Sequence, residues 1–157
     1  MKRKIFASFL FSLVVFTLFP LKIVVAKVDT GELLALTNTK RLEAGIAPLT
    51  LNSKLSVAAQ NKAIDMVNAK YWAHYSPSGR SPWSFISASG YKYRFAGENL
   101  ARYVNSSTDT VTLWMGSELH RKNLLSAKYK DVGFYVYEGE YMGKNGILVV
   151  QMFGSRN

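Results

Sequence analysis

Two histidines are the side chains of this sequence best suited to chemistry near neutral pH. His74 lies in the stretch Tyr-Trp-Ala-His-Tyr-Ser-Pro, and His120 lies in the stretch Ser-Glu-Leu-His-Arg-Lys-Asn. Between them, Glu98 follows a glycine in Gly-Glu-Asn-Leu-Ala. Imidazole changes charge near neutrality and is the commonest metal ligand in proteins. Two imidazoles and a carboxylate are able to hold a divalent cation such as zinc, or the carboxylate is able to fix the tautomer of one imidazole.

Each of these residues also has a purely structural interpretation. Hydrogen bonds from His74 would stabilise its loop, Glu98 would fix the turn around Gly97, and His120 would cap or pack against its helix. The three segments are far apart in the chain, so they meet only if the fold brings them together. Tryptophan is more typical of a core or a cleft wall than of a ligand platform, and this applies to Trp72, Trp83 and Trp114.

The N-terminal segment has the composition of an export signal. A basic start, Met-Lys-Arg-Lys, precedes an uncharged run from Ile5 to Phe19, which is the pattern of a secretory signal peptide. We predict a signal peptide over residues 1–26, with cleavage after Ala26. The alternative is a retained membrane anchor, because residues 5–25 approach the roughly 20 residues that a spanning helix needs. Residues 27–157 then form a single domain, which is secreted, or membrane-anchored outside the cytoplasm if the leader is retained.

Composition narrows the partners of this domain. The absence of cysteine excludes a disulfide framework and a lipidated cysteine, so packing alone must stabilise the fold. Four of the 20 basic residues lie in the leader, which leaves 16 basic against 10 acidic residues. A basic exported domain is attracted to anionic lipid or cell-wall polymer, and salt weakens that attraction. The basic residues are scattered, which is also typical of a solvated surface, so we expect no nucleic-acid partner.

Helices are predicted in the first half of the domain. Asp29 is a suitable N-cap for a helix that ends at Ala44, and Glu32 is placed to return the capping hydrogen bond. Ser53 is a suitable N-cap for a second helix. Apolar side chains recur in that helix at helical spacing, at Leu55, Ala59, Ala63 and Met66.

The segment that contains the first histidine is predicted to be a loop. Residues 71–82 are punctuated by proline and glycine, and a short helix from Trp83 to Ser89 follows Pro82. Residues 91–95 alternate aromatic and basic side chains, which predicts a strand with Gly97 after its end.

The last third of the chain combines short helices with a hairpin. A helix capped by Thr108 or Asp109 is followed by a short helix over residues 118–125, which carries the second histidine. Strands over residues 132–137 and 147–153 are joined by a polar, glycine-containing turn. Helices come first and strands mostly late, an order that favours an α+β fold over repeated βαβ units.

Short motifs spread over nearly all of residues 30 to 155 resemble one known family in their order. These motifs are Asn38-x-x-Arg41, His74-x-Ser-Pro-x-Gly79, Gly97-Glu-Asn-Leu-Ala101, Trp114-x-x-Ser-x-x-His120, Asp131-Val-Gly133 and Val150-Gln-x-Phe-Gly154. The chain resembles the bacterial branch of the CAP superfamily, whose SCP domain is shared by cysteine-rich secretory proteins, venom allergens and plant pathogenesis-related proteins. The resemblance implies an α+β fold of the three-layer α/β/α sandwich type, in which His74, Glu98 and His120 line one open cleft.

The sequence departs from the family pattern beside the second histidine. Bacterial members usually carry Pro-Gly where this chain has Glu118 and Leu119. Many eukaryotic members carry a second acid at the position that is Ser117 here. A one-residue step turns a helix by about 100°, so the side chain of Glu118 points in a different direction from a side chain at position 117. Ser117 or Glu118 is therefore a candidate for a further member of the cleft.

Two functions are compatible with this pattern. The resemblance favours a non-catalytic exported binding or signalling module whose cleft engages a lipid, an envelope polymer or a protein. The alternative is a divalent-metal-assisted hydrolase, in which His74 and His120 bind zinc or another cation and Glu98 acts as a base or orients a ligand. In a third interpretation these polar residues stabilise the fold, and the functional surface lies elsewhere.

Overall fold

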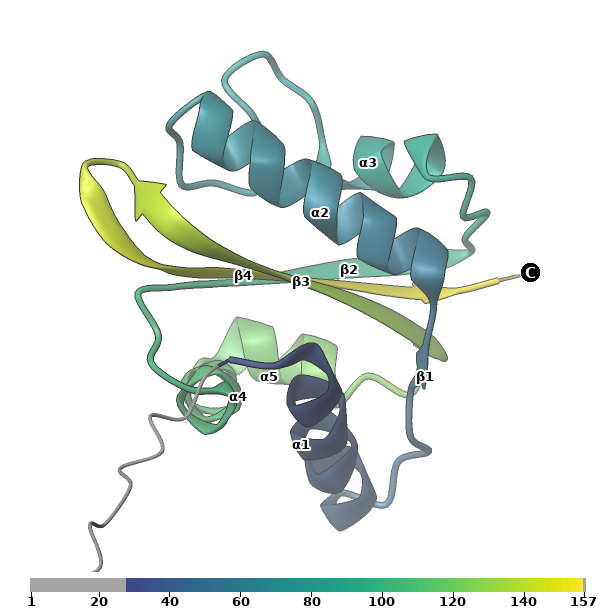
Figure 1. Cartoon of the computed structure of the whole chain (residues 1–157). Coiled ribbons are helices and arrows are strands. Elements are labelled where there is room, and N and C mark those ends of the chain that lie inside the picture. The colour runs from purple at the N-terminus through teal and green to yellow at the C-terminus, as the bar shows by residue number, and fades with distance from the viewer. Residues whose placement is uncertain (1–27, 157) are drawn as a thin grey trace, which may run out of the picture.

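The computed structural model describes residues 28–156 (Figure 1). The predicted signal peptide and its alternative, a retained anchor, lie outside these residues. Within residues 28–156, no helix has both the length and the apolar character that crossing a membrane requires. The described residues therefore belong to the part of the chain that follows the predicted leader.

A four-stranded mixed sheet forms the middle of three layers, in the strand order β1-β3-β4-β2. The strands are β1 (Thr50–Leu51), β2 (Phe95–Arg102), β3 (Asp131–Tyr141) and β4 (Lys144–Ser155). Figure 1 shows helices on both faces of this sheet. One face carries α2 (Ser53–Asn68) and α3 (Pro82–Ala88), and the other carries α1 (Thr30–Glu43), α4 (Ser107–Gly116) and α5 (Glu118–Leu124). This is the predicted α+β, three-layer α/β/α sandwich.

Separate apolar cores fill the two sides of the sheet. Strand β4 contributes to both, because successive side chains of a strand point to opposite faces. Leu148, Val150 and Met152 pack in the core beneath α2 and α3. Val149 and Phe153 pack in the other core, against α1, α4 and α5. The long central hairpin thus connects the two halves of the molecule.

Helix α2 crosses β3 at very close range. At Gly133, an ideal Cβ would lie 2.2 Å from backbone atoms of Leu55 and Ser56. Ala58 and Ala59 of the same helix are fully buried, and their small side chains let the helix lie close to the sheet. Since the loop after α2 carries the first histidine, this contact helps to set the position of that loop above the sheet.

Two helix caps differ from those predicted. Helix α2 is capped by Asn52, whose side chain accepts from the backbone N–H groups two and three residues further on, and Ser53 is its first helical residue. Helix α4 is capped by Ser106, which accepts from the backbone N–H of Asp109 at 3.0 Å, so the choice of Thr108 or Asp109 was wrong. Asparagine and serine cap equally well, so neighbouring polar residues compete for the position.

The first helix is capped as predicted, but without the reciprocal bond. The side chain of Asp29 accepts from the backbone N–H of Glu32 at 2.9 Å. The backbone N–H of Asp29 donates to the hydroxyl of Ser107 at 2.9 Å and not to Glu32. The start of α1 is therefore tied to the start of α4, a long-range contact that a local capping pattern does not contain.

Strand β2 lies further along the chain than predicted. It begins at Phe95, where the predicted strand ended, and it pairs antiparallel with β4 over its whole length. Glu98 therefore lies within the strand and not after it. Residues 91–94 are outside the strand, and their alternation reflects Tyr91 and Tyr93 packing in or against the core.

The bounds of the other predicted helices agree with the observed bounds within one residue. The strands of the hairpin form where they were predicted but are longer. The helix after Pro82 and the helix after Ser117 form where they were predicted. Strands β3 and β4 form the predicted hairpin and are longer than expected at both ends. Strand β1 was not predicted, because its two residues are too few to show a periodic pattern.

Candidate functional site

A cleft of about 350 Å³ lies beside β2, at the edge of the sheet. Because the sheet ends at β2, the loop after α2 and helix α5, which belong to opposite layers, meet there. The polar lining consists of His74, Glu98, Ser117, His120 and Asn123, and the apolar lining includes Trp72, Leu100 and Leu119. The fold thus places both histidines and Glu98, from three separate segments, around one cleft.

Glu98 is a buried carboxylate that makes a short hydrogen bond to His74. Its Oε1 lies 2.6 Å from Nδ1 of His74. Glu98 is 4% exposed, whereas the side chain of His74 is 53% exposed. A proton on Nδ1 donates to the carboxylate, which leaves Nε2 of His74 for solvent or a ligand. Burial raises the pKa of Glu98, and the hydrogen bond from His74 and the positive charge of Lys62 oppose that shift.

His120 enters the cleft from α5 in an environment that favours the neutral ring. Burial first, and then the positive charge of His74, lower the pKa of His120. Among the described residues, buried Nδ1 of His120 has no hydrogen-bond partner, and neither has buried Oε2 of Glu98. Leaving such an atom unpaired costs about 1–3 kcal/mol. Both atoms are shielded from solvent, so a water or ligand gains this free energy only when a shift of the cleft walls exposes them.

A buried lysine supports the loop that carries His74. Lys62 of α2 is fully buried, and its Nζ donates to the hydroxyl of Tyr71 at 3.0 Å. It also donates to the backbone oxygens of Ala73 at 2.9 Å and His74 at 2.7 Å. Burial lowers the pKa of Lys62, and nearby carboxylates, first that of Glu98, oppose the shift. The ammonium group holds the loop backbone, and its charge favours the ionised form of Glu98.

Two asparagines attach α5 to β2. Asn123 donates from Nδ2 to the backbone oxygen of Glu98 at 3.0 Å and to Oδ1 of Asn99 at 2.9 Å. Asn99 donates from Nδ2 to the backbone oxygen of His120 at 3.2 Å and to Oε1 of Gln151 at 3.1 Å. Adjacent strand residues point to opposite faces, so Glu98 holds one histidine while Asn99 holds the backbone of the other. The Gly-Glu-Asn motif thereby positions both layers of the cleft.

Side chains also bond to alternate carbonyl groups of β2. In an edge strand, alternate carbonyl groups point away from the neighbouring strand and need other donors when they are buried. Such bonds join the Tyr129 hydroxyl to Ala96 at 3.0 Å, Asn123 Nδ2 to Glu98 at 3.0 Å and Trp114 Nε1 to Leu100 at 3.1 Å. The donors come from α4, α5 and the loop after α5, so these segments are fastened along the edge of the sheet.

The structure places the two further candidates in different hollows. Ser117 lines the cleft. Glu118 is exposed and lines a neighbouring depression beside α5. Ser117 is the residue that precedes α5 and Glu118 is its first helical residue, so one step along the chain changes the direction of the side chain.

Some residues on which the site depends were not predicted as site residues. Lys62 carried a signal, because its spacing from Leu55 and Met66 places it on the buried face of α2. A charged residue on such a face needs buried partners. Asn99 and Asn123 stood within the quoted motifs, but nothing in their spacing showed that they bond to one another.

The side chains able to coordinate a cation decide whether a metal ion would fit the cleft. Within residues 28–156, no group of three or more His, Cys, Asp or Glu side chains is arranged to hold a metal ion. The cleft offers Nε2 of His74 and the ring of His120, whose Nδ1 is shielded from solvent. Glu98 orients the first ring as carboxylates commonly do for metal-binding histidines. Catalytic zinc usually has three protein ligands. A cation held here would need water or a bound molecule for its remaining ligands.

Two solved structures share this fold. An extracellular protein containing an SCP domain from Bacillus anthracis str. Ames matches with a TM-score of 0.71 and 25% identity, covering 81% of this chain and 40% of that chain. An outer surface protein from Borrelia burgdorferi matches with a TM-score of 0.71 and 23% identity, covering 83% and 98%. The second likeness shows the fold alone.

Two relatives in sequence and one family model match most of this chain. An uncharacterized protein of Bacillus subtilis (strain 168) is 35% identical over 119 residues, which are 72% of this chain and 46% of that protein. An uncharacterized membrane protein of the same strain is 30% identical over 116 residues, covering 74% and 33%. The chain therefore spans less than half the length of these curated relatives. Residues 34–153 match the cysteine-rich secretory protein family, CAP. Because this match includes most of the sequence, the chain belongs to the CAP family.

Proposed function

We propose that the protein is an extracytoplasmic, non-catalytic binding module whose cleft holds a hydroxyl-bearing unit of an envelope polymer. The observation that carries this proposal is the pair of unpartnered buried atoms, Oε2 of Glu98 and Nδ1 of His120. An ionised carboxylate accepts hydrogen bonds, and a neutral imidazole nitrogen accepts or donates according to its tautomer. Both atoms are shielded from solvent in this conformation. A hydroxyl group both donates and accepts, so a ligand that carries hydroxyls would satisfy both atoms once a shift of the cleft walls exposes them.

The rest of the lining supports a ligand with both apolar and polar surfaces. Trp72, Leu100 and Leu119 provide apolar walls beside the polar groups. A few placed polar groups among apolar side chains are the usual form of a small-ligand site, and sugars and polyols combine C–H surfaces with hydroxyls. The extracellular SCP-domain protein from Bacillus anthracis supports an extracytoplasmic location.

The replacement Glu98→Gln tests this role directly. Glutamine keeps an oxygen for the bond to His74 but places an NH₂ group where Oε2 accepts, so it repels a ligand hydroxyl that donates there. A hydrogen bond to a charged group contributes about 1.5–3 kcal/mol. We expect retention on purified envelope polymer to weaken by at least about tenfold, measured as bound fraction against polymer concentration at low and at high salt.

Glu140→Gln is the matched control, because it removes one negative charge from an exposed position in the hairpin. It should leave retention unchanged. The melting temperature separates binding from structure: Glu98→Gln removes the negative charge that faces His74 and buried Lys62, so it should lower the melting temperature, and retention is compared where both proteins are fully folded. If Glu98→Gln loses stability but keeps full retention, the residue has a structural role and the proposed binding site is wrong.

A second candidate function is the metal-assisted hydrolase. It is favoured by one specific observation, the carboxylate–imidazole pair that leaves Nε2 of His74 available in the cleft that His120 also lines. When bound, a cation would polarise a substrate or activate water. Glu98 would then act through His74, by holding the orientation of its ring.

Zinc titration distinguishes this candidate. A cation bound by both histidines stabilises the folded state by about 2.7 kcal/mol at 100 times its dissociation constant. The hydrolase candidate therefore predicts a rise in melting temperature with zinc that His74→Ala and His120→Ala each abolish. An equal rise in the wild type and in both variants would assign zinc to other residues and remove this candidate.

A further inference from the structure

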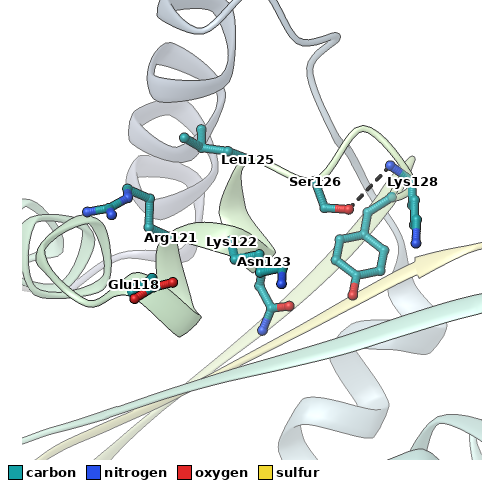
Figure 2. Close-up of a pocket in the computed structure, with 8 residues that line it drawn as sticks. Glu118, Arg121, Lys122, Asn123, Leu125, Ser126 and Lys128 are labelled. Carbon is teal, nitrogen blue, oxygen red and sulfur yellow. Dashed lines mark hydrogen bonds between the residues drawn. The ribbon is translucent and has the colours of Figure 1, made fainter.

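A depression of about 560 Å³ lies beside α5 and the loop that follows it (Figure 2). Three cationic side chains line it, Arg121, Lys122 and Lys128, and Glu118 is the one acidic residue of its lining in the described chain. Figure 2 shows Lys128 on the side of the depression opposite to Arg121. Positive charges that surround a hollow from several sides favour an anionic occupant.

The described part of the chain provides no carboxylate partner for these three cationic side chains. Within the part of the chain that the structure describes, none of the three forms an ion pair. Arg121 donates from Nη1 to the backbone oxygen of Met115 at 2.9 Å. Nζ of Lys128 lies 5.3 Å from the ring centre of Phe95. A carbonyl and an aromatic ring orient a cation without cancelling its charge, so the groups stay available to an anion.

A fourth cation lies beneath the loop. Arg41 is 1% exposed, and its guanidinium donates to the backbone oxygens of Leu124 at 2.7 Å, Ser126 at 3.0 Å and Tyr129 at 3.3 Å. Burial lowers the pKa of Arg41, but arginine remains protonated in proteins. These acceptors are neutral, so the guanidinium holds the floor of the depression in place and adds positive potential below it.

The depression continues towards the cleft. Asn123 and Tyr129 line it together with a second hollow of about 400 Å³, and that hollow is also lined by His74 and Glu98. Asn123 lines the cleft as well. The three hollows are therefore neighbours along one side of β2. A chain-like ligand is able to contact the cations at one end and Glu98 at the other.

We propose that the basic depression binds the phosphate diesters of an anionic, hydroxyl-bearing envelope polymer. Arginine and lysine donate charge-assisted hydrogen bonds to phosphate oxygens, and a diester keeps its negative charge throughout the physiological pH range. A repeating polymer places a phosphate beside Lys122 and Lys128 while a hydroxyl of another unit reaches Glu98. This inference rests on the proposed function, because it names the ligand class of the same groove.

The test uses the exported protein and four probes: a linear polymer of glycerol phosphate, inorganic phosphate, polyglutamate, and vesicles that contain phosphatidylglycerol. Chemical shifts of backbone amides in residues 118–130 report binding at the depression. We expect the glycerol phosphate polymer to bind most tightly and to weaken as salt is added. The double variant Lys122→Gln, Lys128→Gln should bind it about tenfold more weakly, since two exposed charge contacts are lost.

The matched control is the double variant Lys70→Gln, Lys144→Gln, which removes the same charge from the turn after α2 and from the exposed first residue of β4. An equal loss of polymer affinity in this control would mean that the polymer is held only by the overall positive charge of the domain, and the proposed site would be wrong. If polyglutamate or the vesicles bind more tightly than the glycerol phosphate polymer, the proposed ligand class is wrong. If inorganic phosphate binds as tightly as the polymer, the site recognises phosphate alone and the proposal of a polymer is wrong. Glu98→Gln separates the two proposals: if polymer binding depends on the lysines but not on Glu98, the basic site stands and the proposed cleft function fails.

Discussion

Replacing Gly133 by alanine is expected to lower the free energy of unfolding by roughly 3 kcal/mol or more. The added Cβ would lie 2.2 Å from backbone atoms of Leu55 and Ser56. Backbone atoms cannot move aside as the end of a side chain does, so the whole of α2 would shift away from β3. Chemical denaturation followed by circular dichroism measures the loss, and amide shifts of the loop around His74 should report the displaced helix.

Gly116→Ala is the control for this substitution. Apart from its chain neighbours and the backbone of its own helix, no described atom lies within 4 Å of an added Cβ at this position, which is the last residue of α4. Its free energy of unfolding should stay within about 0.5 kcal/mol of the wild type. If Gly133→Ala were as stable as Gly116→Ala, the close crossing of α2 over β3 would be wrong.

The replacement Lys62→Met is expected to lower the free energy of unfolding by about 3 kcal/mol. Methionine fills a similar volume but leaves the hydroxyl of Tyr71 and the backbone oxygens of Ala73 and His74 without their donor. It also removes the positive charge that favours the ionised form of buried Glu98. Denaturation measures the stability, and hydrogen exchange in residues 71–76 should become faster because the loop loses its support.

Lys40→Met provides the comparison at an exposed position. Lys40 pairs with Glu43 at 2.8 Å on the surface of α1, and exposed pairs contribute little, so the change should stay within about 1 kcal/mol. Should Lys62→Met retain wild-type stability and slow exchange in residues 71–76, the lysine would not be the support of the loop. Comparing the losses of unfolding free energy in Lys62→Met and Lys40→Met thus measures how much more a buried lysine stabilises the fold than an exposed one.

Elements with a strong local signal could be predicted from the sequence. The first two helices combine apolar periodicity with polar caps, and the β3–β4 hairpin joins strands that are adjacent in the chain. Strand β2 depends instead on β4, because Phe95 pairs with Ser155 and the pairing fixes where the strand begins. The alternation over residues 91–94 is produced by packing of Tyr91 and Tyr93 without a strand. A period of two therefore indicates alternate burial and does not by itself establish pairing.

The candidate site shows a similar division. The motifs named His74, Glu98 and His120 together, and the structure places all three around one cleft. Their unpaired atoms depend on packing from both layers, which no local pattern contains. Arg41 and Lys62 belong to residue types that are usually exposed. Each is buried here because backbone carbonyl groups accept hydrogen bonds from its charged end, from the distant loop after α5 for Arg41 and from the loop directly after α2 for Lys62.

The bonds that side chains make to alternate carbonyl groups of β2 also bear on how this protein behaves when it is crowded. A bare edge strand is a template on which a second chain can add a strand and begin to aggregate. Tyr129, Asn123 and Trp114 already occupy acceptors that such a chain would need. The same donors border or support the hollows beside β2. The edge therefore stays open to a ligand while it resists the edge-to-edge association of neighbouring copies.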